Sequence, residues 1–543
     1  MLKSMRIEIP EIPAAERTPL VEALLAIIDL QQQRLGQLEE TVQQLRDEIA
    51  ILKGQKPRPQ IAPSVLEKPL ATTPPPEQKR PGSDKRSKNA HLVIHNTQWL
   101  DVPQAPPGSI HRGYEAFVVQ DLHIEARATR YWRQRVQTPD GDTILAPLPP
   151  EVLPGRHFGC GLIAFLLHQH HHNGVTQPLL LEQLHEWGID ISAGQIHRLL
   201  TEDVGIFHQE KDELLPVGLS VSSYIGVDDT GARHQGHNGF CTAISNDLFA
   251  FFQSADSKSR INFLEVLRGA CTAYAINETA RAYWKEQGLS ASAIDNLSGG
   301  PSSFGDDAAW QAWLAQAGLA AERLVRIATE GALLGCLIEQ GISPHLVVLS
   351  DGAGQFNVLV HASCWVHAER PLTRLIPHGE EHRLAIARVQ MVLWELYQDL
   401  KSYRQRPDPG SKRVLESRFD ELVGGKTGYP SIDGVLKEMR DHKADLLRIL
   451  EQPEVPLHNN GTESDIREYV KKRKISGGTR SEAGRRCRDT FTSLKKTCRK
   501  LGLSFWSYLK DRLGRVGQVP RLRELIRQRA AEKSPGKVVA VQV

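Results

Sequence analysis

The chain lacks several features that would each point to a particular class of protein. Its seven cysteines form no Cys-x-x-Cys pair, which argues against a disulfide framework and against a cysteine zinc site. Its longest apolar runs fall well short of the roughly 18 residues that a membrane span needs. The first residues have no apolar core of signal-peptide type. We therefore expect a reducing, cytoplasmic setting.

Charge of one sign is also scarce overall, because the net charge is only +3 over 543 residues. A chain of this length predicts several domains rather than one core. The charge is unevenly spread, with 16 Lys and Arg against 6 Asp and Glu between residues 459 and 515. Such an excess is typical of a surface that meets a polyanion, although a solvated helix face would look the same.

A heptad pattern runs through residues 20–53, and nine of its ten seam positions are apolar. This pattern predicts a coiled coil in residues 1–54 and hence a homodimer or higher homo-oligomer. A single amphipathic helix packed on its own domain is the alternative. The seam positions are Val21, Leu24, Ile28, Gln31, Leu35, Leu38, Val42, Leu45, Ile49 and Leu52.

Composition changes twice after the heptad. Residues 55–90 are rich in Pro, Lys and Arg, which predicts an extended basic linker. Residues 91–150 contain the strand-like stretches YEAFVVQDLHI and TRYWRQRVQ and the turn-like TPDGDT. They predict a small β-rich module.

Residues 155–215 carry the pattern of a helix-turn-helix. Thr176 and Pro178 open one apolar helix, and Gly188 ends it. Ser192 opens the next helix with Gln195 three residues later, which is a capping-box spacing. On this second helix Gln195, His197 and Arg198 are candidates to face DNA, although any helical hairpin has a similar pattern.

Three acidic positions stand out in the region 220–515. Asp228 and Asp229 end an apolar strand, Asp351 ends another, and Glu463 opens a helix after Asn459 and Asn460. Each alone has an ordinary structural explanation, as a turn residue or as a carboxylate that complements the helix dipole. Together, two strand-end aspartates and a helix glutamate suit two Mg²⁺ or Mn²⁺ ions at a phosphodiester.

At this point the chain resembles the insertion-sequence-66 family of bacterial DDE transposases. The resemblance covers most of the chain, from the coiled coil to about Arg515, and it rests on motifs that occur in the family's order. These motifs are VDDTGARHQGHNGFCTAISND, SKSRINFLEVLRG, LSDGAGQFN, CWVHAER and NNGTESDIREYVKKRKISGG.

The resemblance implies a multidomain protein, mainly α, with an α/β catalytic core of RNase H-like fold in residues 220–515. Helical insertions near 275–335 and 375–455 would account for the long gaps between the acidic residues, and residues 516–543 form a tail. The catalytic and metal-binding residues would be Asp228, Asp351 and Glu463, with Asp229 as a neighbour of Asp228.

The chain departs from the family's usual pattern in one place. Residues 91–150 contain no cysteine, so the zinc finger that family members carry there is not expected, and no zinc is expected elsewhere. Cys364 and His367 of the CWVHAER motif offer only two ligands, so we expect them to pack beside the active site.

The implied function is a DNA transposase of the cytoplasm, associated with the bacterial nucleoid. It would bind the terminal inverted repeats of its element, hydrolyse the phosphodiester at each end and join the ends to target double-stranded DNA. Accessory proteins of the same element are expected partners, and a non-catalytic DNA-binding regulator is the alternative. Residues expected to contact DNA besides those of the helix-turn-helix are Arg370, Arg467, Lys471, Lys472, Arg473 and Lys474.

Overall fold

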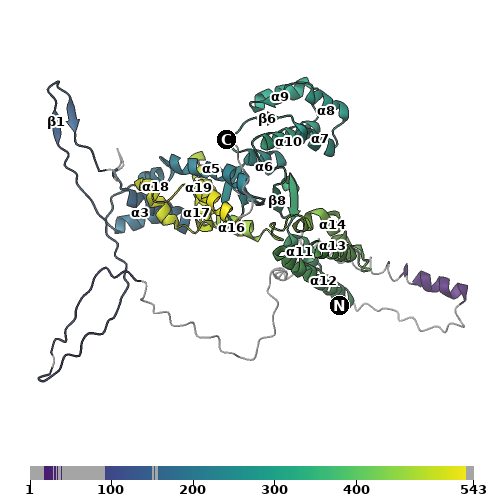
Figure 1. Cartoon of the computed structure of the whole chain (residues 1–543), viewed down its shortest axis with the longest axis horizontal. Helices are drawn as coiled ribbons and strands as arrows, with labels where there is room; N and C mark the ends of the chain where they lie inside the picture. The colour runs from purple at the N-terminus through teal and green to yellow at the C-terminus, as the bar shows by residue number, and fades with distance from the viewer. Residues whose placement is uncertain are drawn as a thin grey trace.

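The fold was analysed in a computed structural model of the chain (Figure 1). Its described part is mainly helical and is built around one mixed five-stranded sheet. Within that part, no helix combines the length and the apolar character needed to cross a membrane. The structure describes residues 18–28, 30–31, 34, 38, 92–104, 106–149, 152 and 157–533.

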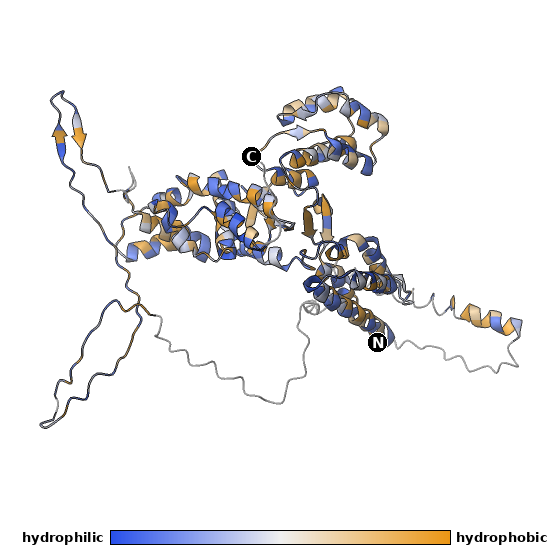
Figure 2. Ribbon diagram, in the orientation of Figure 1, coloured by the Kyte–Doolittle hydropathy of each residue, from blue (hydrophilic) through white to orange (hydrophobic). Residues whose placement is uncertain are grey.

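The N-terminal heptad is described only in part. Residues 19–28 are helical and largely apolar (Figure 2), and two of the predicted seam residues, Leu24 and Ile28, are exposed. Exposed apolar positions at heptad spacing are what one strand of a coiled coil presents without its partner. Most of the later heptad and the basic linker 55–90 lie outside the described residues, so the coiled coil stays a prediction.

The β-rich module predicted in residues 91–150 is wrong in most of its length. Among the described residues of this segment, the strands are those of one hairpin, between β1 (Arg135–Gln137) and β2 (Thr143–Leu145), around the predicted TPDGDT turn. The stretch 114–124 has no strand, and its Phe117 and Leu122 are exposed. Strand propensity needs neighbouring strands and a covered face to take effect, and this stretch has neither.

Two short helices around a turn follow, at the position of the predicted helix-turn-helix. The capping box forms as predicted, because Ser192 Oγ accepts from the Gln195 N–H at 3.2 Å and Gln195 Oε1 accepts from the Ser192 N–H at 2.8 Å. Whether the pair reads DNA stays a prediction. The helices of this region are α2 (Cys160–His168), the π-helical turn η3 (Gln169–Asn173), α3 (Gln177–Glu186), α4 (Ala193–Thr201) and α5 (Gly205–Val221).

The sheet has the strand order β5-β4-β3-β8-β9. Within this sheet β3, β4 and β5 pair antiparallel in sequence order, and β8 and β9 extend the sheet in parallel with β3. This mixed sheet agrees with the predicted α/β core. The strands are β3 (Tyr224–Gly231), β4 (Phe240–Ser245), β5 (Ala250–Ala255), β8 (Val347–Ser350) and β9 (Val360–Ser363).

Helices fill the first long gap, between β5 and β8. They form a group of their own above the sheet in Figure 1, where Trp310 stacks on Tyr274 at a ring distance of 5.4 Å and Trp284 is fully buried. The elements are α6 (Arg260–Arg268), β6 (Tyr274–Ala275), α7 (Glu278–Glu286), α8 (Ala291–Ser298), β7 (Ser303–Phe304), α9 (Asp307–Gln316) and α10 (Glu322–Glu339).

The second long gap, between β9 and the final helices, holds a further helical group with a separate core around Leu393, Tyr397 and Phe419. In Figure 1 this group lies on the other side of β8 from the first. We refer to it as the α11–η5 lobe. Its elements are α11 (Trp365–Arg374), α12 (Glu380–Gln405), α13 (Pro409–Gly424), α14 (Pro430–Asp441), α15 (Lys443–Leu446) and η5 (Arg448–Leu450).

The last helices return to the sheet and close its β5 edge. Side chains of α17 accept the outward N–H groups of that strand: Thr497 Oγ1 accepts from Ala250 at 3.1 Å and Ser493 Oγ from Phe252 at 2.9 Å. A sheet edge covered in this way cannot pair with another chain. The four helices are α16 (Asn460–Ser476), α17 (Glu482–Lys500), α18 (Phe505–Gly514) and α19 (Leu522–Lys533).

Candidate active site

Asp228 lies within β3, and Asp351 directly follows β8. The prediction that Asp228 and Asp229 end their strand is wrong, because β3 continues to Gly231 and both residues pair with β4. The parallel register pairs Gly226 with Leu349, so Asp228 and Asp351, each two residues further on, are level with each other. Adjacent strands lie about 4.8 Å apart. The two aspartates are therefore neighbours, although 123 residues separate them in the chain.

The electrostatic environment of Asp228 shows what surrounds it. Burial, and then the negative charges of Asp351 and Glu463, raise the pKa of Asp228 to about 7, against the effect of the Asp229 N–H that its Oδ1 accepts at 2.8 Å. Like charges raise a carboxyl pKa in this way only when they are close. Asp351 and Glu463, on two other elements, therefore lie near enough to Asp228 for their charges to act on it.

A close contact between α16 and the sheet brings Glu463 into this group. Asn459 Nδ2 donates to the Val227 carbonyl at 2.7 Å, and Ser245 Oγ donates to Thr462 Oγ1 at 3.0 Å. Gly226 makes the approach possible, because a Cβ there would lie 2.2 Å from Thr462 Oγ1.

Asn459, which the sequence places just before this helix, occupies the N-cap position but does not cap it through its side chain. The amide binds β3 instead, so the residue fastens the helix to the sheet. The Asn459 N–H is satisfied by Cys364 Sγ at 3.3 Å.

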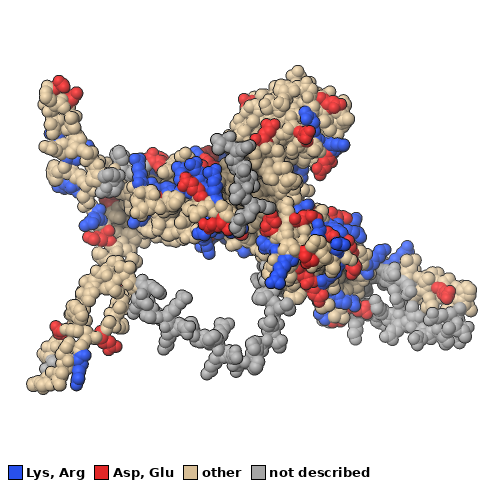
Figure 3. All heavy atoms as spheres, viewed as in Figure 1, with Lys and Arg blue, Asp and Glu red and all other residues tan. Residues whose placement is uncertain are grey.

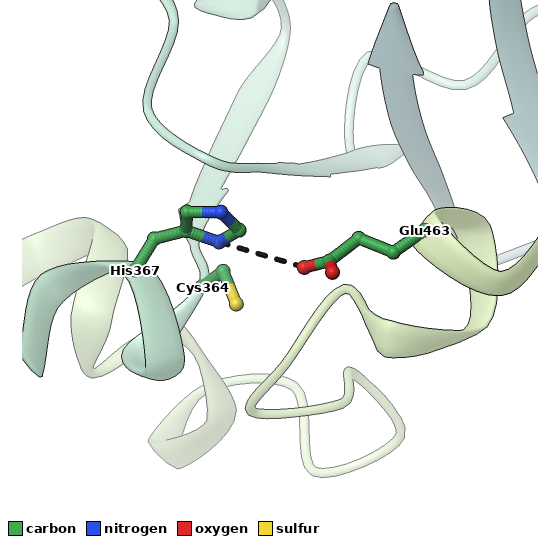
Figure 4. A group of neighbouring side chains, drawn as sticks. All are labelled: Cys364, His367 and Glu463. Carbon is green, nitrogen blue, oxygen red and sulfur yellow. Dashed lines mark ion pairs between the residues drawn. The ribbon is translucent and has the colours of Figure 1, made fainter. Parts of the chain in front are cut away.

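Glu463 faces His367 across a short gap (Figure 4). His367 Nδ1 lies 3.7 Å from Glu463 Oε1, and Arg467 donates to Glu463 Oε2 at 3.1 Å. Cys364, His367 and Glu463 present ligand atoms within 4.8 Å of one another, a group with the dimensions of a metal site. Burial raises the pKa of the Cys364 thiol, and the expectation that no zinc binds stays a prediction.

The neighbouring acidic residues have other partners. Asp229 Oδ2 accepts from Gln355 Nε2 at 2.7 Å, and the positive charge of Lys258 lies nearby. Gln355 is on the short turn η4 (Gly354–Phe356). It was not singled out in the sequence, although it belongs to the LSDGAGQFN motif, and only its place after Asp351 could have signalled it.

The three residues of α4 that were predicted to contact DNA differ in their exposure to solvent. His197 and Arg198 are exposed on the helix surface. Gln195 is half-buried, and its side-chain oxygen is committed to the capping box. The side-chain oxygen of Gln195 is therefore occupied within the helix, and His197 and Arg198 are the accessible pair.

Lys472 was predicted to contact DNA, and the structure corrects this. The residue is 9% exposed, and its ammonium donates to the His170 carbonyl of η3. Burial, then the charges of Arg488 and Lys495, lower the pKa of Lys472 to about 7. A buried cation with a backbone partner cannot neutralise a DNA phosphate.

The other basic residues of α16 and α11 differ in how free they are. Lys471 and Lys474 are exposed, whereas Arg473 is half-buried and donates to the Gly231 carbonyl at the end of β3. Arg370 is half-buried on α11, and its charge lowers the pKa of His367, after the larger effect of burial.

The α11–η5 lobe carries charge of both signs on the face shown in Figure 3. Several of its surface cations are paired, for example Lys443 with Asp420 at 2.6 Å and Lys412 with Glu451 at 2.6 Å. Such pairing weakens the field of one sign that would attract a polyanion. The lobe therefore differs from the basic end of α16.

Comparison with known proteins indicates the family of the chain. The family model described as Transposase IS66 family matches residues 344–486, a stretch that includes Asp351 and Glu463. An uncharacterized protein of Sinorhizobium fredii, y4jO, is 41% identical over 308 residues, which cover 56% of this chain and 96% of that protein. These matches show that the chain belongs to the IS66 family of transposases.

Proposed function

We propose that the chain is a DNA transposase that cuts the ends of its own insertion sequence and joins them to target DNA, with Asp228, Asp351 and Glu463 as the catalytic residues. The observation that carries this proposal is that β3, β8 and α16 bring Asp228, Asp351 and Glu463 near one another, so that burial first and then the charges of Asp351 and Glu463 raise the pKa of Asp228 to about 7. Concentrated negative charge of this kind is costly unless a cation neutralises it.

The group fits divalent cations by its donor chemistry. All three residues offer carboxylate oxygens, which are the ligands that Mg²⁺ and Mn²⁺ prefer. Glu463 Oε1 is buried and makes no hydrogen bond, so it is available as a ligand. Two such ions, when bound, would stabilise negative charge on the attacking and leaving oxygens of a phosphodiester.

The surrounding residues hold these carboxylates in place. The Ala353 N–H donates to Asp351 Oδ1 at 3.0 Å, which orients that side chain after the strand ends. Arg467 and His367 flank Glu463 from two sides. No Ser or Cys nucleophile is needed, because water attacks in hydrolysis and a DNA 3′-OH attacks in joining.

DNA binding and assembly complete the proposal. The exposed His197 and Arg198 of α4 are available for the terminal repeats. Lys471 and Lys474, also exposed, lie on α16 at the end away from Glu463 and suit the phosphate backbone. The N-terminal heptad would join two copies, so that both ends of the element are held together.

The test is a strand-transfer assay with Mg²⁺ on DNA that carries the element's ends. Wild type is compared with Asp228→Asn and with Asp229→Asn as the matched control, since both residues are half-buried neighbours on β3. DNA binding by each variant is measured first by gel shift. The expected result is that Asp228→Asn binds DNA but neither cuts nor joins it, while Asp229→Asn retains both steps.

The opposite results separate the alternatives. If wild type binds the ends but never cuts, the non-catalytic regulator becomes the better account. If cutting occurs and both variants retain it, the carboxylate assignment fails while a transposase remains.

A further inference from the structure

Three side chains are linked by hydrogen bonds between the α11–η5 lobe and the end of β8. Asp445 Oδ2 of α15 lies 3.0 Å from His361 Nδ1 of β9, and His361 Nε2 lies 2.8 Å from Ser350 Oγ of β8. The Gly352 N–H donates to the same Ser350 oxygen at 3.0 Å. This series of hydrogen bonds therefore ends at the backbone turn that contains Asp351.

The direction of each hydrogen bond follows from what each group can donate. An ionised carboxylate only accepts, so Nδ1 of His361 carries a proton toward Asp445. The other nitrogen, Nε2, then accepts the Ser350 hydroxyl proton when the ring is neutral. Ser350 Oγ keeps a lone pair for the Gly352 N–H, so each polar atom along the chain is satisfied.

Asp445 is well suited to anchor this chain. Burial raises its pKa, but the hydrogen bond and charge of His361, with those of His442, outweigh burial and hold the pKa of Asp445 below its usual value. The Arg448 side chain adds a second tie, because its Nε donates to the His361 carbonyl at 3.2 Å. Both ends of the histidine are thus held by the lobe.

The three residues have the order of a hydrolase triad, but their burial excludes that role. Ser350 is fully buried at 0% exposure and His361 is 6% exposed. A nucleophile must reach its substrate, and this hydroxyl reaches only His361 and the Gly352 N–H. The chain of hydrogen bonds instead fixes local backbone geometry.

The backbone that it fixes is an unusual one. Gly352 has a φ of +92°, a conformation that glycine adopts readily. Asp351 itself is exposed, and the Ala353 N–H is a hydrogen-bond partner of its carboxylate. Without the Ser350 contact, the turn would lose the bond that sets the direction of the strand end beneath Asp351.

We propose that Ser350, His361 and Asp445 are positioning residues that hold Asp351 in the orientation it needs to bind a divalent cation. Through them the α11–η5 lobe, which lies beside β8 in Figure 1, sets the geometry of the carboxylate group. This inference rests on the proposed function. Residues that orient metal ligands typically change metal affinity or activity about 10- to 100-fold when they are replaced.

The experiment measures Mn²⁺ affinity by the electron paramagnetic resonance signal of the free ion, and the Mg²⁺ dependence of DNA cleavage. The variants are Ser350→Ala and Asp445→Ala, with Asp445→Asn as the conservative replacement whose amide oxygen still accepts from Nδ1. The control is Ser254→Ala, which removes a similarly buried hydroxyl of the same sheet, bonded to Asp489 at 2.8 Å. Thermal unfolding and DNA binding are recorded for every variant.

The expected result is that Ser350→Ala and Asp445→Ala bind Mn²⁺ about 10-fold more weakly and need more Mg²⁺ for half-maximal cleavage. DNA affinity should stay unchanged, Asp445→Asn should regain most of the loss, and Ser254→Ala should bind metal as wild type does. Asp445 is a partly exposed residue, so its variants test the proposal even if Ser350→Ala does not fold.

Two failures are distinguishable. The positioning role is overturned if wild type binds Mn²⁺ and cleaves DNA while Ser350→Ala and Asp445→Ala do so equally well, or if Ser254→Ala weakens metal binding as much as they do. The proposed function itself fails if wild type binds no Mn²⁺ or if Asp351→Asn binds it as tightly as wild type, and the positioning role then falls with it.

Discussion

Two carboxylates of helix α16, Glu463 and Asp465, meet different electrostatic surroundings. Asp465 is buried against two ammonium groups, with Lys500 Nζ at 2.7 Å and Lys496 Nζ at 3.4 Å. Two residues earlier, Glu463 joins Asp228 and Asp351, whose charges oppose one another. One group is neutralised by the protein itself, and the other is left with excess negative charge.

The difference separates carboxylates that support the fold from those available for chemistry. A buried charge with a good partner is tolerated, whereas like charges that lie near one another destabilise the folded state. The sequence NNGTESDIRE holds both kinds within a few residues, so residue type alone does not distinguish them. The lysines of α17 do, because they approach Asp465 and Glu468 and leave Glu463 to the active-site side.

The largest loss of stability is expected when the ion pairs of Asp465 are broken. Asp465→Ala would leave Lys496 and Lys500 without their buried partner, and removal of one member of a buried pair costs about 3–5 kcal/mol. The free energy of unfolding in urea measures this loss. Glu463→Gln is the control and should change stability far less; equal losses for the two variants would show that the two groups do not differ.

A change at the contact between α16 and β3 comes next. Gly226→Ala places a Cβ against Thr462 Oγ1 and Asn459 Oδ1, and overpacking of this kind costs about 1–3 kcal/mol. We also expect cleavage to fall, because Glu463 moves with the helix. Urea unfolding and the cleavage rate measure the two effects.

Gly161→Ala is the matched control for that change. Gly161 lies in α2, and nothing stands within 4 Å of a Cβ there. Gly161 is in the first turn of the helix, so alanine there should stabilise the protein by less than the roughly 0.5–1 kcal/mol that it gives in a helix interior, and should not destabilise it. If Gly226→Ala were equally harmless, the close approach of α16 would not be needed.

The pH dependence of stability sharpens the comparison. The pKa of Asp228 is raised from 3.8 to about 7 in the folded protein, so between these values the folded state holds a proton that the unfolded chain has released. The stability of the metal-free protein should therefore fall as pH rises from about 4 through 7.

Asp228→Asn should remove this part of the pH dependence. Above pH 7 we expect the metal-free variant to be more stable than wild type by about 1–2 kcal/mol, a value discounted for solvent screening. Urea unfolding in EDTA at pH 5 and pH 8 measures the difference. A variant that is no more stable than wild type at pH 8 would show that the three carboxylates do not repel one another.

The smallest effect is expected at the surface. The Arg467 side chain is 72% exposed where it meets Glu463, and exposed pairs contribute about 0–1 kcal/mol. Arg467→Ala should thus leave the melting temperature nearly unchanged. A large drop in that temperature would mean that Glu463 depends on this arginine as Asp465 depends on its lysines.

The sequence predicts that Asp228 and Asp351 each follow an apolar strand run, and the parallel register of β3 and β8 brings the two level. It does not predict that β3 continues past Asp228 to Gly231. It also predicts the capping box at Ser192, since that motif is local. It does not predict the fate of Lys472, which looks like any surface lysine until η3 packs over it. Burial of a charged residue depends on segments about 300 positions away, which no local pattern reports.

The contacts that shape the site are also non-local. Gly226 would pass for an ordinary strand residue without Thr462 above it, and Ser350, His361 and Asp445 meet across 95 positions of the chain. In residues 114–124 local propensity predicts a strand that does not form, because these strand-forming residues have no sheet to join. Local propensity decides an element only where tertiary contacts agree with it.

The most direct test of the account is a calorimetric titration of Mn²⁺ into the metal-free protein, with wild type, Glu463→Gln and Glu468→Gln compared. Both glutamates lie on α16, but Glu468 is paired with Lys495 at 3.6 Å and Glu463 belongs to the carboxylate group. The account predicts that wild type and Glu468→Gln bind Mn²⁺ alike and that Glu463→Gln binds it far more weakly. Equal binding by all three would contradict the claim that Asp228, Asp351 and Glu463 form a cation site.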